Sequence, residues 1–298
     1  MESAGEYDYI IVGAGTAGCV LANRLTARKQ INVLLIEAGG KDDYMWIHIP
    51  VGYLHCIGNP RTDWLFNTEP DPGLGGRALI YPRGKVLGGS SSINGMIYMR
   101  GQRGDYDRWA ELTGDPSWRW DKVLPLFMKS EDHHAGANGV HGAGGEWRVE
   151  KQRLSWSILD AFRDAAEQVG IPKVDDFNGG DNDGCSYFEV NQRRGIRLNT
   201  AKAFLRPAAQ RPNLTVMTGC HVERLLVEDS GQGMVCLVVE FTGGGKTFTA
   251  VAHRETLLAA GTIGSPQILQ LSGVGPAAAL QRCGITPLVD SPGVGENL

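Results

Sequence analysis

The sequence has few cysteines and no long hydrophobic run. Its six cysteines in 298 residues form no CxxC pair. They therefore suggest neither a zinc site nor a disulfide framework, and they favour a reducing, cytoplasmic compartment. No apolar run approaches the roughly 20 residues that a membrane-spanning helix needs. The first apolar strand begins so close to Met1 that we expect no signal peptide.

The sequence also lacks an excess of either charge. The 29 Lys and Arg residues against 33 Asp and Glu residues give a net charge of −4. This balance provides no basic surface for nucleic acid. With 21% charged and 42% hydrophobic residues, the composition is typical of a soluble globular protein. We therefore predict that the partner is a small molecule.

A glycine motif of the form GxGxxG follows the first apolar run. Residues 10–12 are continuously apolar, as in a buried parallel strand, and residues 19–25 have the apolar spacing of a helix. Gly13 permits the sharp turn between them, Gly15 lets a pyrophosphate approach the backbone, and Gly18 lets the helix lie close to the strand. The motif predicts a dinucleotide site at the start of this helix.

An acidic residue stands where such a site needs one. A second apolar strand, residues 33–36, ends in Glu37, nineteen residues after Gly18. A carboxylate there accepts hydrogen bonds from ribose hydroxyls and repels the 2′-phosphate of NADP. At the end of a strand, Glu37 is expected to contribute little to the core. The alternative, a glycine-rich loop followed by a surface glutamate, does not explain the order of strand, glycines, helix, strand and acid.

A second glycine-rich motif occupies residues 84–101. Gly88, Gly89 and three consecutive serines offer backbone and hydroxyl donors suited to phosphates or to the polar edge of a ring system. Asn94 could hydrogen-bond such an edge. The alternative is that the serines cap a helix beginning near Ser92. That alternative does not account for the glycine pair.

These motifs resemble those of a known family. Residues 84–101 resemble the first signature of the glucose-methanol-choline (GMC) family of flavin-dependent alcohol oxidoreductases, and residues 261–275 resemble the second. The similarity runs from about Tyr7 to the last residue and is nearest the choline dehydrogenase and primary alcohol dehydrogenase branch. It implies an α/β fold with a discontinuous Rossmann-like FAD-binding domain, residues 1–150 and 196–298. The intervening residues 151–195 would form the beginning of an α+β substrate domain.

The resemblance also implies how FAD is held. The implied cofactor-binding residues are Gly13, Gly15, Thr16, Ala17, Gly18, Glu37, Val86, Leu87, Gly88, Ser90, Asn94, Gly95, Met96, Ile97, Val222 and Gly261. In the family, the residue at the place of Val222 pairs its main chain with adenine. Relatives that bind flavin covalently use a His immediately before the Asn, and that position is Ile93 here. We therefore predict non-covalent FAD.

The resemblance implies that the protein oxidises a small alcohol to an aldehyde by hydride transfer to FAD, with oxygen or a quinone as electron acceptor. In the family, a C-terminal segment supplies the catalytic His and its partner. None of the seven histidines here has a comparable context, so the catalytic base is unknown. The sequence is part of a longer enzyme, works beside a separate C-terminal half, or has lost catalysis. The alternative function is a truncated flavin-binding or interaction protein without turnover.

Other patterns support further predictions. His133, His134 and His141 fit no helical face, so we predict no metal site, and the resemblance implies a structural turn at His141. Residues 175–184 lack the ligand alternation of a calcium loop and are predicted to form a polar surface loop. Residues 41–79 show no regular period, as expected of a segment that is either functional or laid over a ligand, although each aromatic ring in them is expected to pack in the core.

The pattern of apolar residues predicts the remaining elements. We expect two helices within residues 105–129, an amphipathic helix at residues 156–169 and a helix at residues 194–205. Short strands at residues 214–217, 222–227, 235–241 and 247–252 are predicted to form a meander over one side of the cofactor fold. A last strand, residues 256–259, is predicted to share a sheet with residues 10–12.

Overall fold

The computed structural model describes residues 1–298, which divide into two compact units. The first unit comprises Met1–Ile47, Val51–Ile93 and Asn199–Leu298, and the second comprises His48–Pro50 and Asn94–Leu198. Residues 94–150 thus group with the second unit, whereas the sequence placed them with the cofactor domain. None of the helices combines the length and the apolar character needed to cross a membrane.

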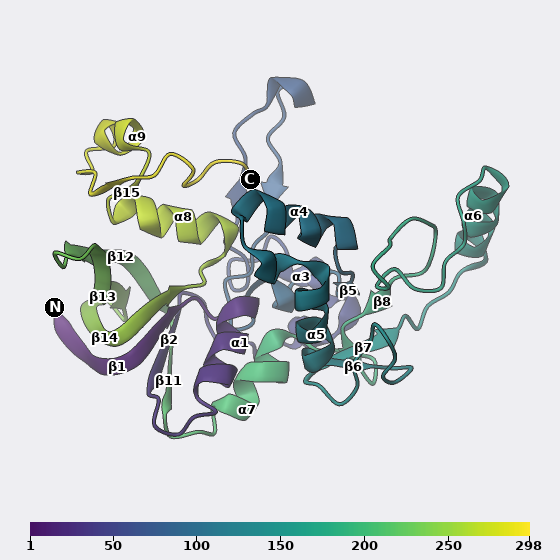
Figure 1. Ribbon diagram of the computed structural model, residues 1–298, viewed down its shortest axis with the longest axis horizontal. Coiled ribbons are helices and arrows are strands. Elements are labelled where there is room, and N and C mark those ends of the chain that lie inside the picture. Colours follow the sequence, from purple (N-terminus) through teal and green to yellow (C-terminus); the bar gives the residue numbers. More distant parts are fainter. The chain divides into compact units, whose positions relative to one another are not determined.

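A six-stranded sheet forms the centre of the first unit (Figure 1). Its order is β11 (Leu214–Thr218), β2 (Val33–Glu37), β1 (Glu2–Val12), β14 (Lys246–Leu258), β13 (Met234–Gly243) and β12 (Cys220–Asp229). The first four strands are parallel, and the pairs β14–β13 and β13–β12 are antiparallel. Ile10 lies opposite Thr256, so the prediction that strands from the two ends of the chain share a sheet is confirmed.

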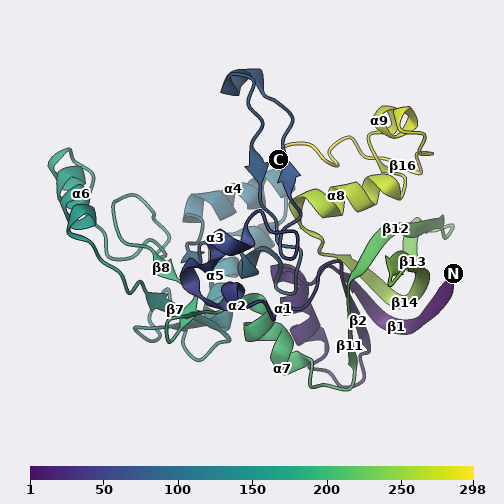
Figure 2. The same ribbon diagram turned by 180° about the vertical axis from the view of Figure 1, so that it is seen from behind.

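The predicted meander is confirmed for β12, β13 and β14, which pair antiparallel in this order, and is wrong for the strand at residues 214–217. Strand β11 pairs with β2 at the opposite edge of the sheet from β12, as both views of the ribbon show (Figure 2). The two predicted strands at residues 247–252 and 256–259 are one strand, β14. The polar residues between them do not break it, because His253 binds Glu6 and Arg254 binds Asp8 on the neighbouring β1, each at 3.0 Å.

Helices cover both faces of this sheet. Ile268 of α8 (Gly261–Leu271) packs in the same core cluster as Ile10, whereas Ile11 lies against Gly18 of α1 (Thr16–Leu25). Because successive side chains of a strand point to opposite faces, α1 and α8 cover opposite faces. Burial on both faces explains why residues 10–12 and 33–36 are continuously apolar.

The remaining elements of the first unit are short. They include α2 (Met45–His48, which ends in the second unit), α3 (Tyr53–Cys56), the hairpin β3 (Phe66–Asn67) and β4 (Ile80–Tyr81), α7 (Arg206–Ala208), β15 (Val274–Gly275), α9 (Ala277–Arg282), β16 (Val289–Asp290) and a π-helical turn, Ala201–Leu205. The predicted helix at residues 194–205 is wrong in its first half. Arg194 and Gly195 adopt positive φ angles of 55° and 78°, which reverse the chain into a hairpin.

The second unit combines helices with small sheets. Its helices are α4 (Arg103–Thr113), α5 (Trp120–Ser130) and α6 (Ser157–Gln168), and its larger sheet has the order β5 (Ile97–Tyr98), β8 (Glu189–Val190), β7 (Trp147–Lys151) and β6 (Glu131–His133). Strands β9 (Gln192–Arg193) and β10 (Ile196–Arg197) form a separate hairpin. Gly114, in the left-handed conformation, ends α4 before α5 begins, so the two helices predicted within residues 105–129 are confirmed. The helix predicted at residues 156–169 is confirmed as α6.

A buried ionic cluster lies in the second unit. The Nδ1 atom of His141 is 3.1 Å from both carboxylate oxygens of Glu131, and its Nε2 atom is 2.8 Å from Asp176. Arg100 completes the cluster through a 2.9 Å ion pair with Glu131. Burial alone would lower the pKa of His141, but the hydrogen bonds to Asp176 and Glu131 raise it to about 9. Residues 175–184 are therefore more than the predicted surface loop, because Asp176 anchors them and Asn178 is buried.

This cluster predicts a pH dependence of stability. The pKa of His141 rises from an ordinary 6.5 to about 9 on folding, so its stabilisation is complete below pH 6.5 and is lost as the pH rises through about 9. Urea unfolding should show a loss of up to about 3 kcal/mol across this range. A His141→Gln variant should not show this loss, whereas the exposed His253→Gln should behave like the unchanged protein. Equal pH profiles for all three would contradict the assignment.

Candidate functional site

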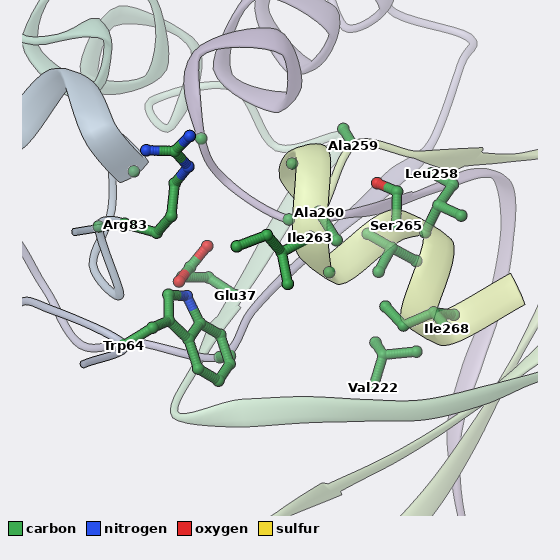
Figure 3. Close-up of a pocket in the computed structure, with 18 of the residues that line it drawn as sticks. Glu37, Trp64, Arg83, Val222, Leu258, Ala259, Ala260, Ile263, Ser265 and Ile268 are labelled. Carbon is green, nitrogen blue, oxygen red and sulfur yellow. The ribbon is translucent and has the colours of Figure 1, made fainter. Parts of the chain in front are cut away.

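A cavity of about 750 Å³ opens in the first unit at the carboxyl ends of its parallel strands. It is lined by the ends of β1, β2 and β14 and by the first turns of α1 and α8. In open α/β sheets this edge is the place where ligands bind. Figure 3 shows the Glu37 carboxylate between Trp64 and Arg83, with Ile263 of α8 on the facing side of the cavity.

The first glycine loop has the geometry that its sequence predicts. Gly13 has a φ of +99°, and a Cβ there would lie 2.6 Å from the carbonyl oxygen of Ala259. A Cβ on Gly18 would overlap the carbonyl oxygen of Gly13, so α1 can approach β1 only with glycine at this position. At Gly15 the nearest atom to a built Cβ is the Cα of Gly89, at 3.9 Å. The backbone of Gly15 is thus open toward the cavity.

The start of α1 can bind an anion. Gly15 is the N-cap residue and brings no side chain to the first N–H groups of the helix. Thr16 and Ala17, which carry two of those groups, line the cavity. Free N–H groups and the positive end of the helix dipole together favour a phosphate at this position.

The second glycine loop packs directly on the first. The Gly88 N–H donates a hydrogen bond to the carbonyl oxygen of Ala14 at 2.8 Å. A Cβ on Gly89 would lie 2.7 Å from the Cα of Gly15, and both Gly88 and Gly89 have positive φ angles, +89° and +53°. The close approach of two backbones therefore explains Gly89, and the positive φ angle of Gly88 explains the other glycine of the pair, which helix capping did not explain.

Only one of the three serines lines the cavity. Gly89–Ser92 form a single 3₁₀ turn, and no α-helix begins near Ser92, so the capping alternative is wrong. Ser90 lines the cavity, whereas Ser91 bonds Thr200 at 2.9 Å and Ser92 bonds the carbonyl oxygen of Leu87 at 2.8 Å. Two of the serines thus stabilise the loop.

Glu37 lines the cavity and also holds its loops together. Its Oε2 atom accepts from the N–H of Ala14 and its Oε1 atom accepts from the N–H of Gly39, both at 2.8 Å. Burial raises the pKa of Glu37, and these two hydrogen bonds and the charge of Lys85 act in the opposite direction. The expectation that Glu37 contributes little to the core is therefore wrong. Each carboxylate oxygen keeps further acceptor capacity for a ligand.

Aromatic residues that the sequence did not assign to the site also line the cavity. The rings of Trp64 and Phe66 are parallel, with centroids 5.7 Å apart, and His221 lies 5.7 Å from Trp64. Lys85 places its Nζ atom 4.6 Å from the centre of the Trp64 ring. The expectation that every ring of residues 41–79 packs in the core is wrong for Trp64 and Phe66. The only signal for them is the irregular, aromatic-rich character of that segment.

The structure divides the predicted site residues into three groups. Those that line the cavity are Gly13, Gly15, Thr16, Ala17, Glu37, Ser90, Val222 and Gly261. Gly18, Val86, Leu87 and Gly88 lie in the same unit but are not among the lining residues, and Val86 packs in a core cluster with Ile47, Cys56 and Ile93. Val222 lies on β12, an edge strand, with its side chain buried.

The third group lies in the second unit and comprises Asn94, Gly95, Met96 and Ile97. There, Asn94 is held by its side-chain carbonyl. Its Oδ1 atom accepts from the Met96 N–H at 3.1 Å and from Arg197 at 2.8 Å. This arrangement leaves the amide nitrogen of Asn94 as the group that can donate to a ligand. A role of these residues toward the cofactor stays a prediction.

Three residues of the second unit have the geometry of a metal site. The Nε2 atoms of His133 and His134 lie 2.8 and 2.9 Å from the same oxygen of Glu189. The Nδ1 atom of His133 accepts from the Ala135 N–H at 3.3 Å, so in the neutral ring the proton is on Nε2. That nitrogen then donates to Glu189, and the group is accounted for as a hydrogen-bonded network.

The chain resembles a family of enzymes over nearly its whole length. A family model described as GMC oxidoreductase matches residues 7–298. An oxygen-dependent choline dehydrogenase of Photobacterium profundum is 44% identical over 98% of this chain and 51% of its own length. A mitochondrial choline dehydrogenase of Homo sapiens is 40% identical over 100% of this chain and 50% of its own length. The chain thus spans about half the length of these relatives.

Solved structures agree with this similarity. Pyridoxine 4-oxidase from Mesorbium loti is 35% identical, with a TM-score of 0.91 over 96% of this chain and 55% of its own. An FAD-dependent oxidoreductase from Chaetomium thermophilum is 32% identical, with a TM-score of 0.89 over 98% of this chain and 52% of its own. The predicted α/β fold and the family resemblance are therefore confirmed.

The contact between the glycine loops can be tested by a matched pair of substitutions. A Gly89→Ala variant places a methyl group 2.7 Å from the Cα of Gly15 and should destabilise the protein by about 1–3 kcal/mol. A Gly58→Ala variant, also at a positive φ (+76°), should cost less stability, because nothing lies within 4 Å of the added atom. Thermal unfolding of both variants measures the difference. Equal melting temperatures would show that the loops do not meet as described.

Proposed function

The chain belongs to the GMC oxidoreductase family, and on this premise we propose that its first unit is an FAD-binding domain and that the protein takes part in oxidising an alcohol. We further propose that the second unit begins the substrate domain. The observation that carries the proposal is the convergence of two glycine loops, a helix start and a buried carboxylate on one cavity. The family and its FAD-dependent neighbour identify FAD as the dinucleotide.

The residues of the cavity fit the adenosine diphosphate part of FAD. The N–H groups of Thr16 and Ala17 would hold the pyrophosphate, which Gly15 leaves room to approach. Glu37 would accept hydrogen bonds from the ribose hydroxyls, and the main chain at Val222 would pair with adenine. When bound, FAD supplies the acceptor for a hydride, and this chain supplies its binding and orientation.

We propose that FAD is held without a covalent bond. The residue before Asn94 is Ile93, whose apolar side chain is 2% exposed and packs against Val86. It offers no nucleophile to the flavin ring. If purified protein is precipitated with acid, the yellow chromophore should stay in the supernatant. Colour retained in the pellet would contradict non-covalent binding.

The names of the relatives indicate a class of substrate and an electron acceptor. Two are choline dehydrogenases, one of them oxygen-dependent, and a structural neighbour is an oxidase. We propose a small alcohol as substrate and oxygen as electron acceptor, with a quinone as the alternative. The six free cysteines support a reducing, cytoplasmic location. We assign no histidine of this chain as the base for the hydroxyl proton.

Spectroscopy separates turnover from binding alone. The purified protein, reconstituted with FAD, should show the visible absorption of a flavin. Adding choline or another small alcohol without oxygen should bleach this absorption if the chain is catalytically competent. Bound flavin that no alcohol bleaches would favour the alternative, a flavin-binding protein without turnover. Absence of bound flavin would contradict both functions.

Replacing Glu37 with Gln tests the adenosine site. The amide accepts at one position only, so either Ala14 or Gly39 loses its acceptor, and stability should fall by about 1–3 kcal/mol. Loss of a charge-assisted bond to ribose should weaken FAD binding roughly ten- to a hundredfold. The exposed Glu69→Gln is the matched control. Titration of apoprotein with FAD, with circular dichroism to confirm folding, gives the answer. Unchanged affinity would mean that Glu37 does not face the ribose.

A further inference from the structure

A segment late in the chain holds the second glycine loop of the first unit. This segment, the clasp segment, comprises Asn199, Thr200 and the π-helical turn Ala201–Leu205. Asn199 and Thr200 are both 0% exposed, so their polar side chains need hydrogen-bond partners within the protein. Thr200 bonds Ser91 and Asn199 bonds Ser92, across 109 and 107 residues of sequence. A π-helical turn is rare and is frequently found at a functional site.

Thr200 fixes the carbonyl group of Gly88. Its Oγ1 atom lies 3.3 Å from that carbonyl oxygen and 2.9 Å from the Oγ atom of Ser91. The Thr200 N–H donates to the Ser91 Oγ atom at 3.0 Å, and the Ser91 hydroxyl donates to the Gly88 carbonyl oxygen at 2.6 Å. The N–H of the same Gly88 donates to Ala14 of the first glycine loop. Thr200 therefore acts on the contact between the two glycine loops through Gly88.

Asn199 holds the same loop with its side-chain amide. Its Nδ2 atom donates to the Ser92 Oγ atom at 2.9 Å and to the Asp42 carboxylate at 3.1 Å. Its Oδ1 atom accepts from the Lys202 N–H at 2.9 Å. The buried Asp42 carboxylate is in turn paired with Arg206 at 2.9 Å. Because both ends of the amide are bonded, the Asn199 side chain has one orientation, and that orientation fixes Ser92.

The clasp segment is also bonded to α1. The side chain of Asn23, which is 5% exposed, donates from Nδ2 to the carbonyl oxygen of Phe204 at 2.8 Å. Figures 1 and 2 both show α7, which directly follows the clasp segment, beside α1. The segment thus joins the helix whose start faces the cavity to the loop that carries Ser90, another lining residue. No residue of the clasp segment lines the cavity, so its effect on a ligand is indirect.

We propose that Asn199 and Thr200 are positioning residues of the FAD site. They hold the second glycine loop against the first before FAD binds, so the cofactor meets a loop that is already ordered. A loop without this support would populate other conformations, and the apparent affinity for FAD would fall in proportion to the population of the competent one. This inference rests on the proposed binding of FAD by the first unit.

Removal of one hydroxyl group tests the inference. A Thr200→Val variant keeps the shape of the side chain and loses the contacts of Oγ1 with Ser91 and Gly88. Titration of apoprotein with FAD should show roughly tenfold weaker binding. A Thr200→Ser variant keeps the hydroxyl group and should bind FAD within about twofold of the unchanged chain.

The matched control is Thr26→Val, at the end of α1. Thr26 is 1% exposed, and its hydroxyl group also has two partners, the carbonyl oxygen of Ala22 at 2.6 Å and the guanidinium of Arg211 at 2.8 Å. Thermal unfolding should show that both Val variants lose stability, because each loses the contacts of a buried hydroxyl group. Only Thr200→Val should also lose affinity for FAD, which separates positioning of the loop from a general loss of stability.

A second measurement does not depend on FAD. Amide hydrogen exchange of residues 88–92 in the apoprotein should be roughly tenfold faster in Thr200→Val than in Thr26→Val. A Ser91→Ala variant removes the same contact from the loop side and should show the same two effects, which covers the case that Thr200→Val does not fold. Equal FAD affinity, or equal loop exchange, in the two Val variants would overturn the inference alone. Failure of the unchanged chain to bind FAD would contradict the proposed function and overturn the inference with it.

Discussion

Two backbone segments that line the cavity approach each other so closely that a side chain at Gly89 would not fit. Gly89 lies against Gly15, and the Gly88 N–H bonds the carbonyl oxygen of Ala14. The Glu37 carboxylate then ties the first loop to the end of β2. The open start of α1 and the Glu37 carboxylate line the same cavity as this contact. Burial raises the pKa of Glu37, and the two N–H groups that donate to its carboxylate compensate part of the cost of burying it.

Local rules of backbone geometry made much of the site predictable from the sequence. Gly13 has a positive φ angle, and a Cβ on Gly18 would overlap the carbonyl oxygen of Gly13, so both roles follow from the local backbone. The serine motif was less predictable, because Ser91 turns inward to bond Thr200, 109 residues away. Trp64 was missed for a similar reason, since its place in the cavity depends on how an irregular segment folds back on the strands.

Long-range pairing also explains the errors in the predicted fold. The polar residues His253 and Arg254 looked like a break between two strands, but acidic residues of β1 pair with them and keep β14 continuous. Glu37 was assigned to a ligand alone, although the same carboxylate supports the loops. The two units differ in how much of their apolar surface is buried. The first unit has a buried core cluster on its central sheet, whereas Ile158, Phe162 and Val169, in and beside α6 of the second unit, are exposed.

The central claim is that the glycine loops, the start of α1 and Glu37 form an adenosine diphosphate site. Competition binding tests it most directly: the protein reconstituted with FAD is challenged with ADP or with FMN, and the release of FAD is followed by flavin fluorescence. Binding through the adenosine half predicts that ADP displaces FAD in a saturable manner and that FMN, which lacks adenosine, does not. Displacement by FMN without displacement by ADP would contradict the account.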